Sequence, residues 1–175
     1  GVHRAMFYAQ CVGVALVGVW ILVGGLGLPA APASSWIAAV VAAPIGVVAT
    51  LGLYHGLKVG QVSVVAPIAA SFGAVTAALS MLSGERLQAS ILIGIVLVIA
   101  GVLLVSVQLR KTGPEARTTG ALWGVFCAVA YGLQFWIQGR FAIPSLGSVW
   151  PVWIYYLISA AMLVGLAFVR RETLG

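Results

Sequence analysis

Two polar side chains, Tyr131 and Gln134, lie within a long uncharged apolar segment, and Gln138 follows one helical turn later. At about 100° per residue, these three side chains share one face of a helix. Leaving a phenol hydroxyl or a carboxamide unpaired in hydrocarbon is costly. Two interpretations follow: these groups form hydrogen bonds between helices, or they line a cavity that binds a small polar solute.

Three further side chains are candidates for the same cavity. Trp150 could provide an aromatic wall, and Tyr54 and His55 stand together at the end of another apolar segment. Histidine changes its charge near neutral pH, so His55 could serve as a protonatable ligand. The alternative is an interfacial histidine that is solvated at a helix end.

A second group of residues suggests structural or gating roles. Pro67 falls inside an apolar segment, where it removes one backbone hydrogen bond and is expected to kink the helix. Glu85 and Arg86 form an adjacent charge pair between two segments. Glu85 could favour the N-terminus of the helix that follows, or the pair could form part of a gate.

No catalytic or metal-binding pattern is visible in the sequence. The two histidines, His3 and His55, are far apart, and the three acidic residues all lie outside the apolar segments. Cys11 and Cys127 lie inside apolar segments and are expected to be packing residues. We therefore predict no enzyme, no cofactor, no metal and no proton pump built on an intramembrane carboxylate.

The apolar segments themselves define the fold class. The sequence is 62% hydrophobic and only 7% charged, far from the composition of a soluble domain. A membrane-spanning helix needs about 20 apolar residues, and in lipid only helices and closed barrels pair their own backbone groups. Strand-like alternation is missing, so we predict an all-α, polytopic transmembrane helical bundle. Its six spans are expected at Ala5–Leu28, Trp36–Tyr54, Val62–Leu82, Ser90–Leu109, Gly120–Ile137 and Val149–Val169.

Basic residues are distributed unequally between the two ends of these spans. Seven lie on the side of the N-terminus (Arg4, Lys58, Arg110, Lys111, Arg117, Arg170 and Arg171), and Arg86 and Arg140 lie on the other. Cytoplasmic loops carry the excess of Lys and Arg, which predicts that both ends are inside. Nine basic residues scattered over short loops form no nucleic-acid-binding patch, so we expect no nucleic-acid partner.

Small residues recur at helical spacing in several spans and predict close helix packing. In the span that carries Tyr131 they are Gly120, Gly124, Ala128 and Gly132, and comparable stripes are Ala38, Ala42, Gly46 and Thr50, then Ala66, Ala70, Ala74 and Ala78, then Ser90, Gly94 and Gly101.

The stretch from Tyr54-His55-Gly56 through Ala66-Pro67 and Gly84-Glu85-Arg86-Leu87 to Gly101-Val102-Leu103-Leu104 resembles the EamA repeat of the drug/metabolite transporter superfamily. Residues Gly124 to Pro151 resemble, more weakly, the start of a second repeat. The resemblance implies a ten-helix transporter built from two inverted repeats. This chain would supply roughly helices two to seven, with residues 1–111 ending the first repeat and 112–175 beginning the second.

The chain departs from the family pattern in two respects. Six spans cannot form the full two-repeat cavity, so we expect either missing helices of the same transporter or a shortened member that forms a homo-oligomer. Family members usually start inside, which places the Glu85-Arg86 turn inside, whereas the distribution of basic residues places it outside.

The function expected from this resemblance is secondary transport of small organic metabolites, such as amino acids, by alternating access across the inner membrane. The expected partners are a small-molecule solute and the lipid bilayer. The uncharged candidate cavity favours zwitterionic or uncharged polar substrates. The alternative is a non-transporting integral membrane subunit or assembly partner, which the small-residue stripes also fit.

Overall fold

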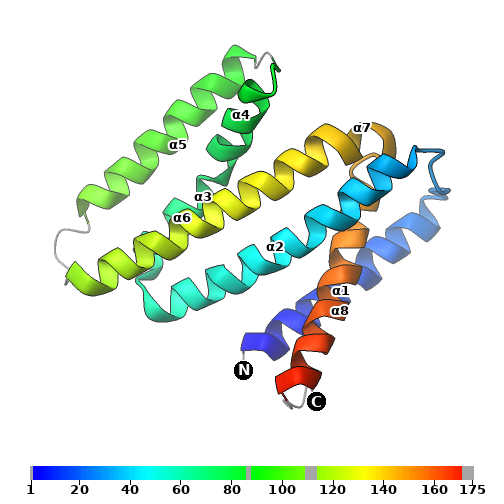
Figure 1. Cartoon of the computed structure of the whole chain (residues 1–175), viewed down its shortest axis with the longest axis horizontal. Helices are drawn as coiled ribbons and strands as arrows, with labels where there is room; N and C mark the ends of the chain where they lie inside the picture. Colours follow the sequence, from blue (N-terminus) through cyan, green and yellow to red (C-terminus); the bar gives the residue numbers. More distant parts are fainter. Residues whose placement is uncertain (1, 86–87, 109–113, 171–175) are drawn as a thin grey trace. The chain divides into compact units, whose positions relative to one another are not determined.

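The regular structure of the chain is entirely helical in the part described by the computed structural model, residues 2–85, 88–108 and 114–170. The elements in chain order are α1 Val2–Val23, α2 Ala33–Val59, α3 Val62–Ala70, α4 Phe72–Leu82, α5 Ala89–Gln108, α6 Pro114–Ile137, the π-helical segment η2 Gln138–Ala142, α7 Ile143–Leu146 and α8 Val149–Arg170 (Figure 1).

Five helical stretches are long and apolar enough to cross a membrane: Met6–Val23, Ala33–Val59, Val62–Leu82, Thr118–Leu146 and Val149–Phe168. Helix α5 also contains a shorter apolar stretch, Ala89–Val102. These stretches confirm the predicted polytopic helical bundle, because each coincides with one of the six expected spans.

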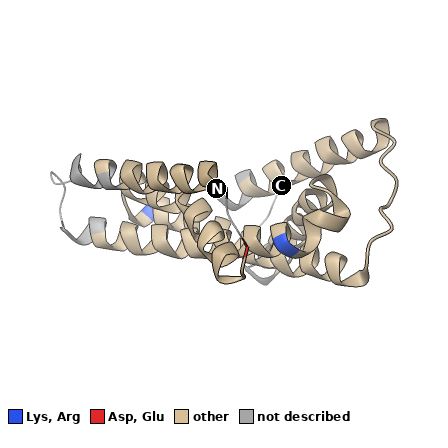
Figure 2. Ribbon diagram, turned by 90° about the horizontal axis from the view of Figure 1, so that it is seen from above, with Lys and Arg blue, Asp and Glu red and all other residues tan. Residues whose placement is uncertain are grey.

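Charged side chains avoid the middle of these helices. Lys58 lies in the last turn of α2, Glu85 between α4 and α5, and Arg140 in η2. Figure 2 draws Lys and Arg in blue and Asp and Glu in red where their placement is described. The charges therefore lie at or near the ends of the spanning stretches, as the cost of burying charge in lipid requires.

The helices pack as two units, one comprising Gly1–Val47 and Ile137–Gly175 and the other Val48–Trp136. The predicted boundary between two repeats, at residues 111 and 112, falls outside the described residues and stays a prediction. Each unit is built by helix packing through small residues, the mode that suits lipid.

In the first unit, α1 packs along α8 (Figure 1). The glycines of α1 admit aromatic rings of α8: a Cβ atom on Gly13 would lie 2.5 Å from the ring of Tyr156, and one on Gly18 would lie 3.4 Å from Nε1 of Trp153. The Trp153 indole donates a hydrogen bond of 3.3 Å to the carbonyl of Val14. Ala39, Ala142 and Leu146 form a separate buried cluster in the same unit.

In the second unit, the predicted small-residue face of α6 is the packing face. Gly120, Gly124, Ala128 and Gly132 are all buried, whereas Leu122, Val125 and Val129 on the opposite side are exposed. A Cβ atom on Gly124 would lie 2.8 Å from Cβ of Ile68, and one on Gly132 would lie 2.6 Å from Cβ of Val75. Glycine therefore sets how closely α6 approaches α3 and α4.

The kink expected at Pro67 takes the form of an interruption of the helix one turn later, at Ser71. Helix α3 ends at Ala70, and α4 starts at Phe72 after Ser71, whose backbone N–H donates to the carbonyl of Ile68 at 3.1 Å. The Ser71 hydroxyl also donates to that carbonyl, at 2.6 Å. By contrast, α2 continues through Pro44 as one helix. Proline alone therefore does not decide where a span breaks.

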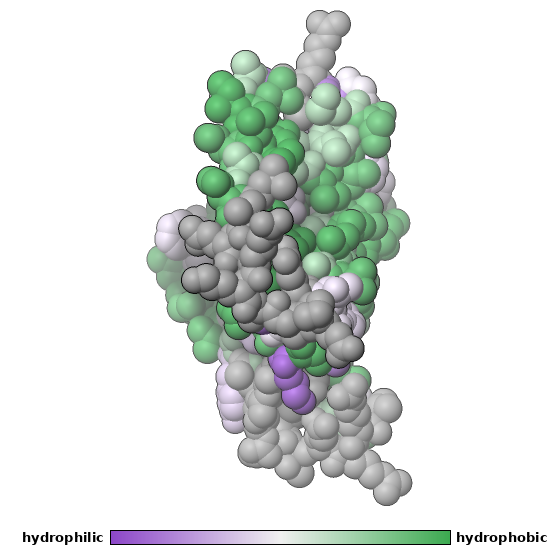
Figure 3. Space-filling model, turned by 90° about the vertical axis from the view of Figure 1, so that its left-hand side faces the viewer, coloured by the Kyte–Doolittle hydropathy of each residue, from purple (hydrophilic) through white to green (hydrophobic). Residues whose placement is uncertain are grey.

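Two predicted small-residue stripes are wrong as packing surfaces. Ala66, Ala70 and Ala78 are exposed, and Val64, Val65, Ala69 and Ala77 are the buried residues of α3 and α4 instead. A Cβ atom on Gly94 or Gly101 of α5 would meet no other atom of the described residues within 4 Å. The outer side chains of α5 are apolar, and apolar residues cover much of the described surface in Figure 3.

The span that carries Tyr131 is longer than predicted. It does not end at Ile137, because η2 and α7 continue the helical path to Leu146, so Arg140 lies on this path and not in a connecting loop. The path ends at Gly147, whose φ of 69° is strained for residues with a Cβ atom. Helix α8 starts two residues later.

Close backbone contact predicts which glycines tolerate substitution. A Cβ atom on Gly60 would lie 2.5 Å from Cα of Gly120, and backbone atoms cannot rotate away. We expect Gly60→Ala to destabilise the protein by about 1–3 kcal/mol through overpacking. The measurement is the free energy of unfolding in detergent.

The matched control is Gly94→Ala, where the added methyl group meets open space. It should leave stability unchanged or raise it slightly, because alanine has the higher helix propensity. Equal losses in the two variants would contradict the packing argument.

Candidate functional site

The hydroxyl of Tyr131 links two helices. It lies 2.8 Å from Oγ1 of Thr50, so α6 and α2 share a partly buried hydrogen bond in which either hydroxyl is the donor. Nearby, the thiol of Cys127 points to the carbonyl of Ala49 at 3.5 Å. The hydroxyl of Tyr131 therefore forms a hydrogen bond between helices, which is the first of the two interpretations of this residue.

Gln134 differs from Tyr131, although it lies one turn farther along the same helix. Its side chain is only 4% exposed, and Oε1 has no hydrogen-bond partner among the described residues. A buried acceptor without a partner costs about 1–3 kcal/mol. The carboxamide of Gln134 therefore keeps a hydrogen-bonding capacity that helix packing does not use.

Aromatic rings and a threonine surround this part of α6. The ring of Phe72 lies 6.0 Å from that of Tyr131 and stacks on Phe135 at 5.1 Å between centroids. The Thr76 hydroxyl lies 3.1 Å from the carbonyl oxygens of both Phe72 and Gly132, and its single proton serves one of them at a time. The break at Ser71 sets Phe72 at the start of α4, where it reaches α6.

Three residues of this region, Thr50, Phe72 and Thr76, were not predicted from the sequence as part of the site. Thr50 was interpreted only as a small packing residue. Its hydroxyl within an apolar span was the signal that could have indicated an interhelical hydrogen bond. Phe72 gives no comparable signal, because its position depends on the break between α3 and α4.

Tyr54 and His55 do not join Tyr131 and Gln134. Both are exposed, Tyr54 at 40%, and the imidazole of His55 lies 4.6 Å from the ring of Trp123. Trp123 precedes Tyr131 by roughly two turns, about 12 Å along the helix axis. In the structure His55 is an exposed side chain beside the ring of Trp123, and both its role as a ligand and its place at the membrane interface stay predictions.

Gln138 and Trp150 belong to the other unit. Gln138 is the first residue of η2 and is buried, with no hydrogen-bond partner for Nε2 in the part of the chain that the structure describes. Trp150 packs edge-on between Trp36 and Trp153, with centroids 5.9 Å from each. Trp150 is thus one member of a row of three tryptophans.

The predicted gating residues are placed only in part. Pro67 lies inside α3, and Glu85 follows α4, with its backbone N–H donating to the carbonyl of Ser80 at 3.0 Å. Arg86 lies outside the described residues. The gate formed by Glu85 and Arg86 therefore stays a prediction.

The sequence segments around Tyr131 and Gln134 contain no charged residue. No Asp, Glu, Lys or Arg occurs from Val59 to Gly84 or from Thr118 to Gly139. Within residues 2–85, 88–108 and 114–170, no three His, Cys, Asp or Glu side chains gather to hold a metal ion. The arrangement can donate and accept hydrogen bonds and offer aromatic contact, and these are means of binding a solute without changing it.

Long apolar helices with hydrogen-bonding groups held inside them define a multi-pass integral membrane protein. The chain matches the EamA-like transporter family over residues 2–107, more than half its length, and it belongs to that family. The family is one of membrane transporters of the drug/metabolite superfamily and not of enzymes.

One relative is an uncharacterized protein of Methanocaldococcus jannaschii. It is 40% identical to this chain over 71 residues, which make up 40% of this chain and 52% of the relative. The match therefore spans about half the length of that curated relative. No solved structure matches the chain.

The bond between Tyr131 and Thr50 can be measured by a double-mutant cycle. We expect Tyr131→Phe and Thr50→Val each to lower the free energy of unfolding, with a coupling of about 0.6 kcal/mol, the average for such bonds in membranes. Tyr54→Phe is the control, since Tyr54 is exposed. Strictly additive losses would show that the two hydroxyls do not stabilise each other.

Proposed function

We propose that this chain is part of a secondary transporter that moves small organic metabolites, such as amino acids or related solutes, across the inner membrane by alternating access. The observation that carries the proposal is the buried Oε1 atom of Gln134, which has no partner among the described residues and lies one turn from Tyr131. A solute that donates a hydrogen bond to this atom would remove the cost of leaving it unpaired.

The chemistry of this region favours a neutral or zwitterionic solute. No charged residue occurs in Val59–Gly84 or Thr118–Gly139, so an ion held beside Tyr131, Gln134 and Phe72 would find no opposite charge within these segments and would pay a large cost of leaving water. Hydrogen bonds from Gln134 and Tyr131 would orient the solute, and the rings of Phe72 and Phe135 would contact its apolar part.

Alternating access requires a place where a span can change direction. The break at Ser71 supplies one within the second unit, because α3 and α4 are separate helices there. We infer that the complete transporter follows the family plan of two inverted repeats. The remaining helices, or a second copy, would then complete the cavity, with Pro67 and Glu85 supporting the moving parts. Its partners are a small-molecule solute and the lipid bilayer, with no nucleic acid.

A second candidate function is that of a non-transporting membrane subunit. The interhelical bond from Tyr131 to Thr50 and the glycine packing of α6 favour it, because both describe a protein built for close assembly. A subunit of this kind has no reason to bind metabolites, so binding of solutes separates the two candidates.

We expect Gln134→Leu to leave the stability of the solute-free protein unchanged or to raise it, since it removes an unpaired buried acceptor. The same change should weaken solute binding about tenfold, the equivalent of one lost hydrogen bond. The measurement is the thermal unfolding of the purified chain against a panel of neutral and zwitterionic metabolites, followed by flux in proteoliposomes. Gln88→Leu is the matched control, because Gln88 is exposed ahead of α5.

Two results would count against the proposal. No stabilisation of the unsubstituted protein by any solute of the panel would favour the membrane-subunit function. Unchanged transport kinetics in both Gln134→Leu and Tyr131→Phe would show that the solute binds elsewhere.

A further inference from the structure

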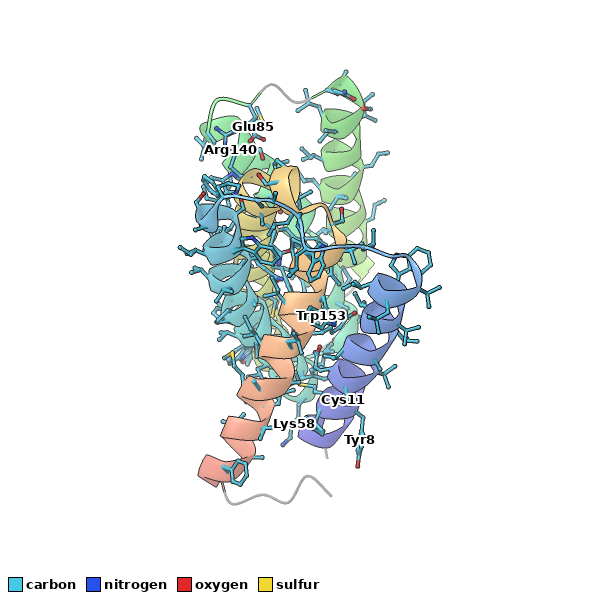
Figure 4. All side chains as sticks on the ribbon, turned by 90° about the vertical axis from the view of Figure 1, so that its right-hand side faces the viewer. Tyr8, Cys11, Lys58, Glu85, Arg140 and Trp153 are labelled. Carbon is cyan, nitrogen blue, oxygen red and sulfur yellow. The ribbon has the colours of Figure 1, made fainter. Side chains whose placement is uncertain are left out.

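The contacts between α1 and α8 fix the register of the two helices. Gly13 lies against Tyr156, while Val14 and Gly18 lie against Trp153. The helices are therefore antiparallel, and residue numbers at the same level sum to about 169. Figure 4 shows Trp153 extending from α8 toward α1, whereas Tyr8 points away from α8. Tyr8 and Cys11 are both exposed.

This register places Gln10 and Ser159 opposite each other. Gln10 precedes Gly13 and Val14 by one turn, so it shares the face of α1 that meets α8. Ser159 follows Tyr156 by one turn on α8. Because the helices are antiparallel, Ser159 lies at the same level as Gln10. Met6 and Leu163, the next residues along this register, are both buried.

Both polar side chains are buried and incompletely paired. Gln10 is 7% exposed and Ser159 is 0% exposed. Neither Oε1 of Gln10 nor Oγ of Ser159 has a hydrogen-bond partner among the described residues, which also means that the two atoms do not bond each other. Each unpaired group destabilises the helix pair unless a third group binds between them.

We propose that Gln10 and Ser159 form a two-point binding site for a hydroxyl group of a small uncharged or zwitterionic solute. A hydroxyl fits both atoms at once, because it donates its proton to Oε1 of Gln10 and accepts the proton of the Ser159 hydroxyl. The site uses α1 and α8, and binding to it does not require that the chain transports the solute.

The residues around Gln10 and Ser159 disfavour a charged group of the solute at this position. Helices α1 and α8 contain no acidic residue that could neutralise an ammonium group. A carboxylate would oppose the unpaired carbonyl oxygen of Gln10, and no basic residue occurs in α1 from Ala5 to Val23 or in α8 from Val149 to Val169. The neighbouring side chains along the interface are Met6, Leu163 and the ring of Tyr156, which suit the carbon skeleton of the solute.

The test compares solutes that differ by one hydroxyl group. The probes are L-serine against L-alanine, and D-ribose against 2-deoxy-D-ribose, and their affinities for the purified chain in detergent are measured by calorimetry. In at least one pair the hydroxylated member should bind about tenfold more tightly, the equivalent of one hydrogen bond. That difference should disappear in Ser159→Ala and in Gln10→Leu, while both variants unfold at the same temperature as the unsubstituted protein or higher in the absence of solute.

The matched control is Ser83→Ala, since the hydroxyl of Ser83 already donates to the carbonyl of Leu79 at 2.7 Å. It should keep the preference for the hydroxylated probe. Equal affinity within both pairs, no binding of any probe, or a preference that survives in both Ser159→Ala and Gln10→Leu overturns the proposal and leaves a bound water as the occupant. The substitution Gln134→Leu should not alter the hydroxyl preference, so failure of this site and failure of the proposed transport site give different results.

Discussion

Close approach of helix backbones is the constraint on which the described structure depends. Lipid is as apolar as a leucine side chain, so helices gain little from burying apolar groups and rely on contact at short range. In the second unit this contact is made where Gly60 meets Gly120 and where Gly124 and Gly132 meet Ile68 and Val75. In the first unit, Gly13 and Gly18 admit the rings of Tyr156 and Trp153. The buried polar groups of both units are held in place by these contacts.

This constraint explains which parts of the fold could be predicted. Six apolar segments and the packing face of α6 follow from composition and helical spacing, because the physical reason for them is local to each segment. The stripe from Ala66 to Ala78 failed for the opposite reason. Small residues permit close packing without requiring it, and α3 instead turns Val65 toward α6. The break at Ser71 could not be predicted from the prolines either. Helix α2 continues through Pro44, whereas the span that contains Pro67 is interrupted one turn later.

Less of the candidate site than of the fold could be predicted, because the sequence does not show which polar side chains form hydrogen bonds with one another. The sequence indicates that Tyr131 and Gln134 share a face, yet it cannot tell which polar group finds a partner on another helix. Thr50 satisfies Tyr131, while Oε1 of Gln134 stays without a described partner. The same distinction applies to Gln10 and Ser159 on other helices. Such differences depend on the register between helices, which no single segment specifies.

The π-helical segment Gln138–Ala142 shows a different way in which the chain specifies orientation. A π turn accommodates more residues than an α turn, so it acts as an extra residue placed within a helix. Everything after it is rotated relative to a continuous α-helix, by about 100° for one residue. The side of the helical path on which Pro144 and the buried Leu146 lie therefore depends on how many residues separate them from Ile137. At this point of the chain, length itself carries structural information, and the loss of one residue would change the fold more than most substitutions.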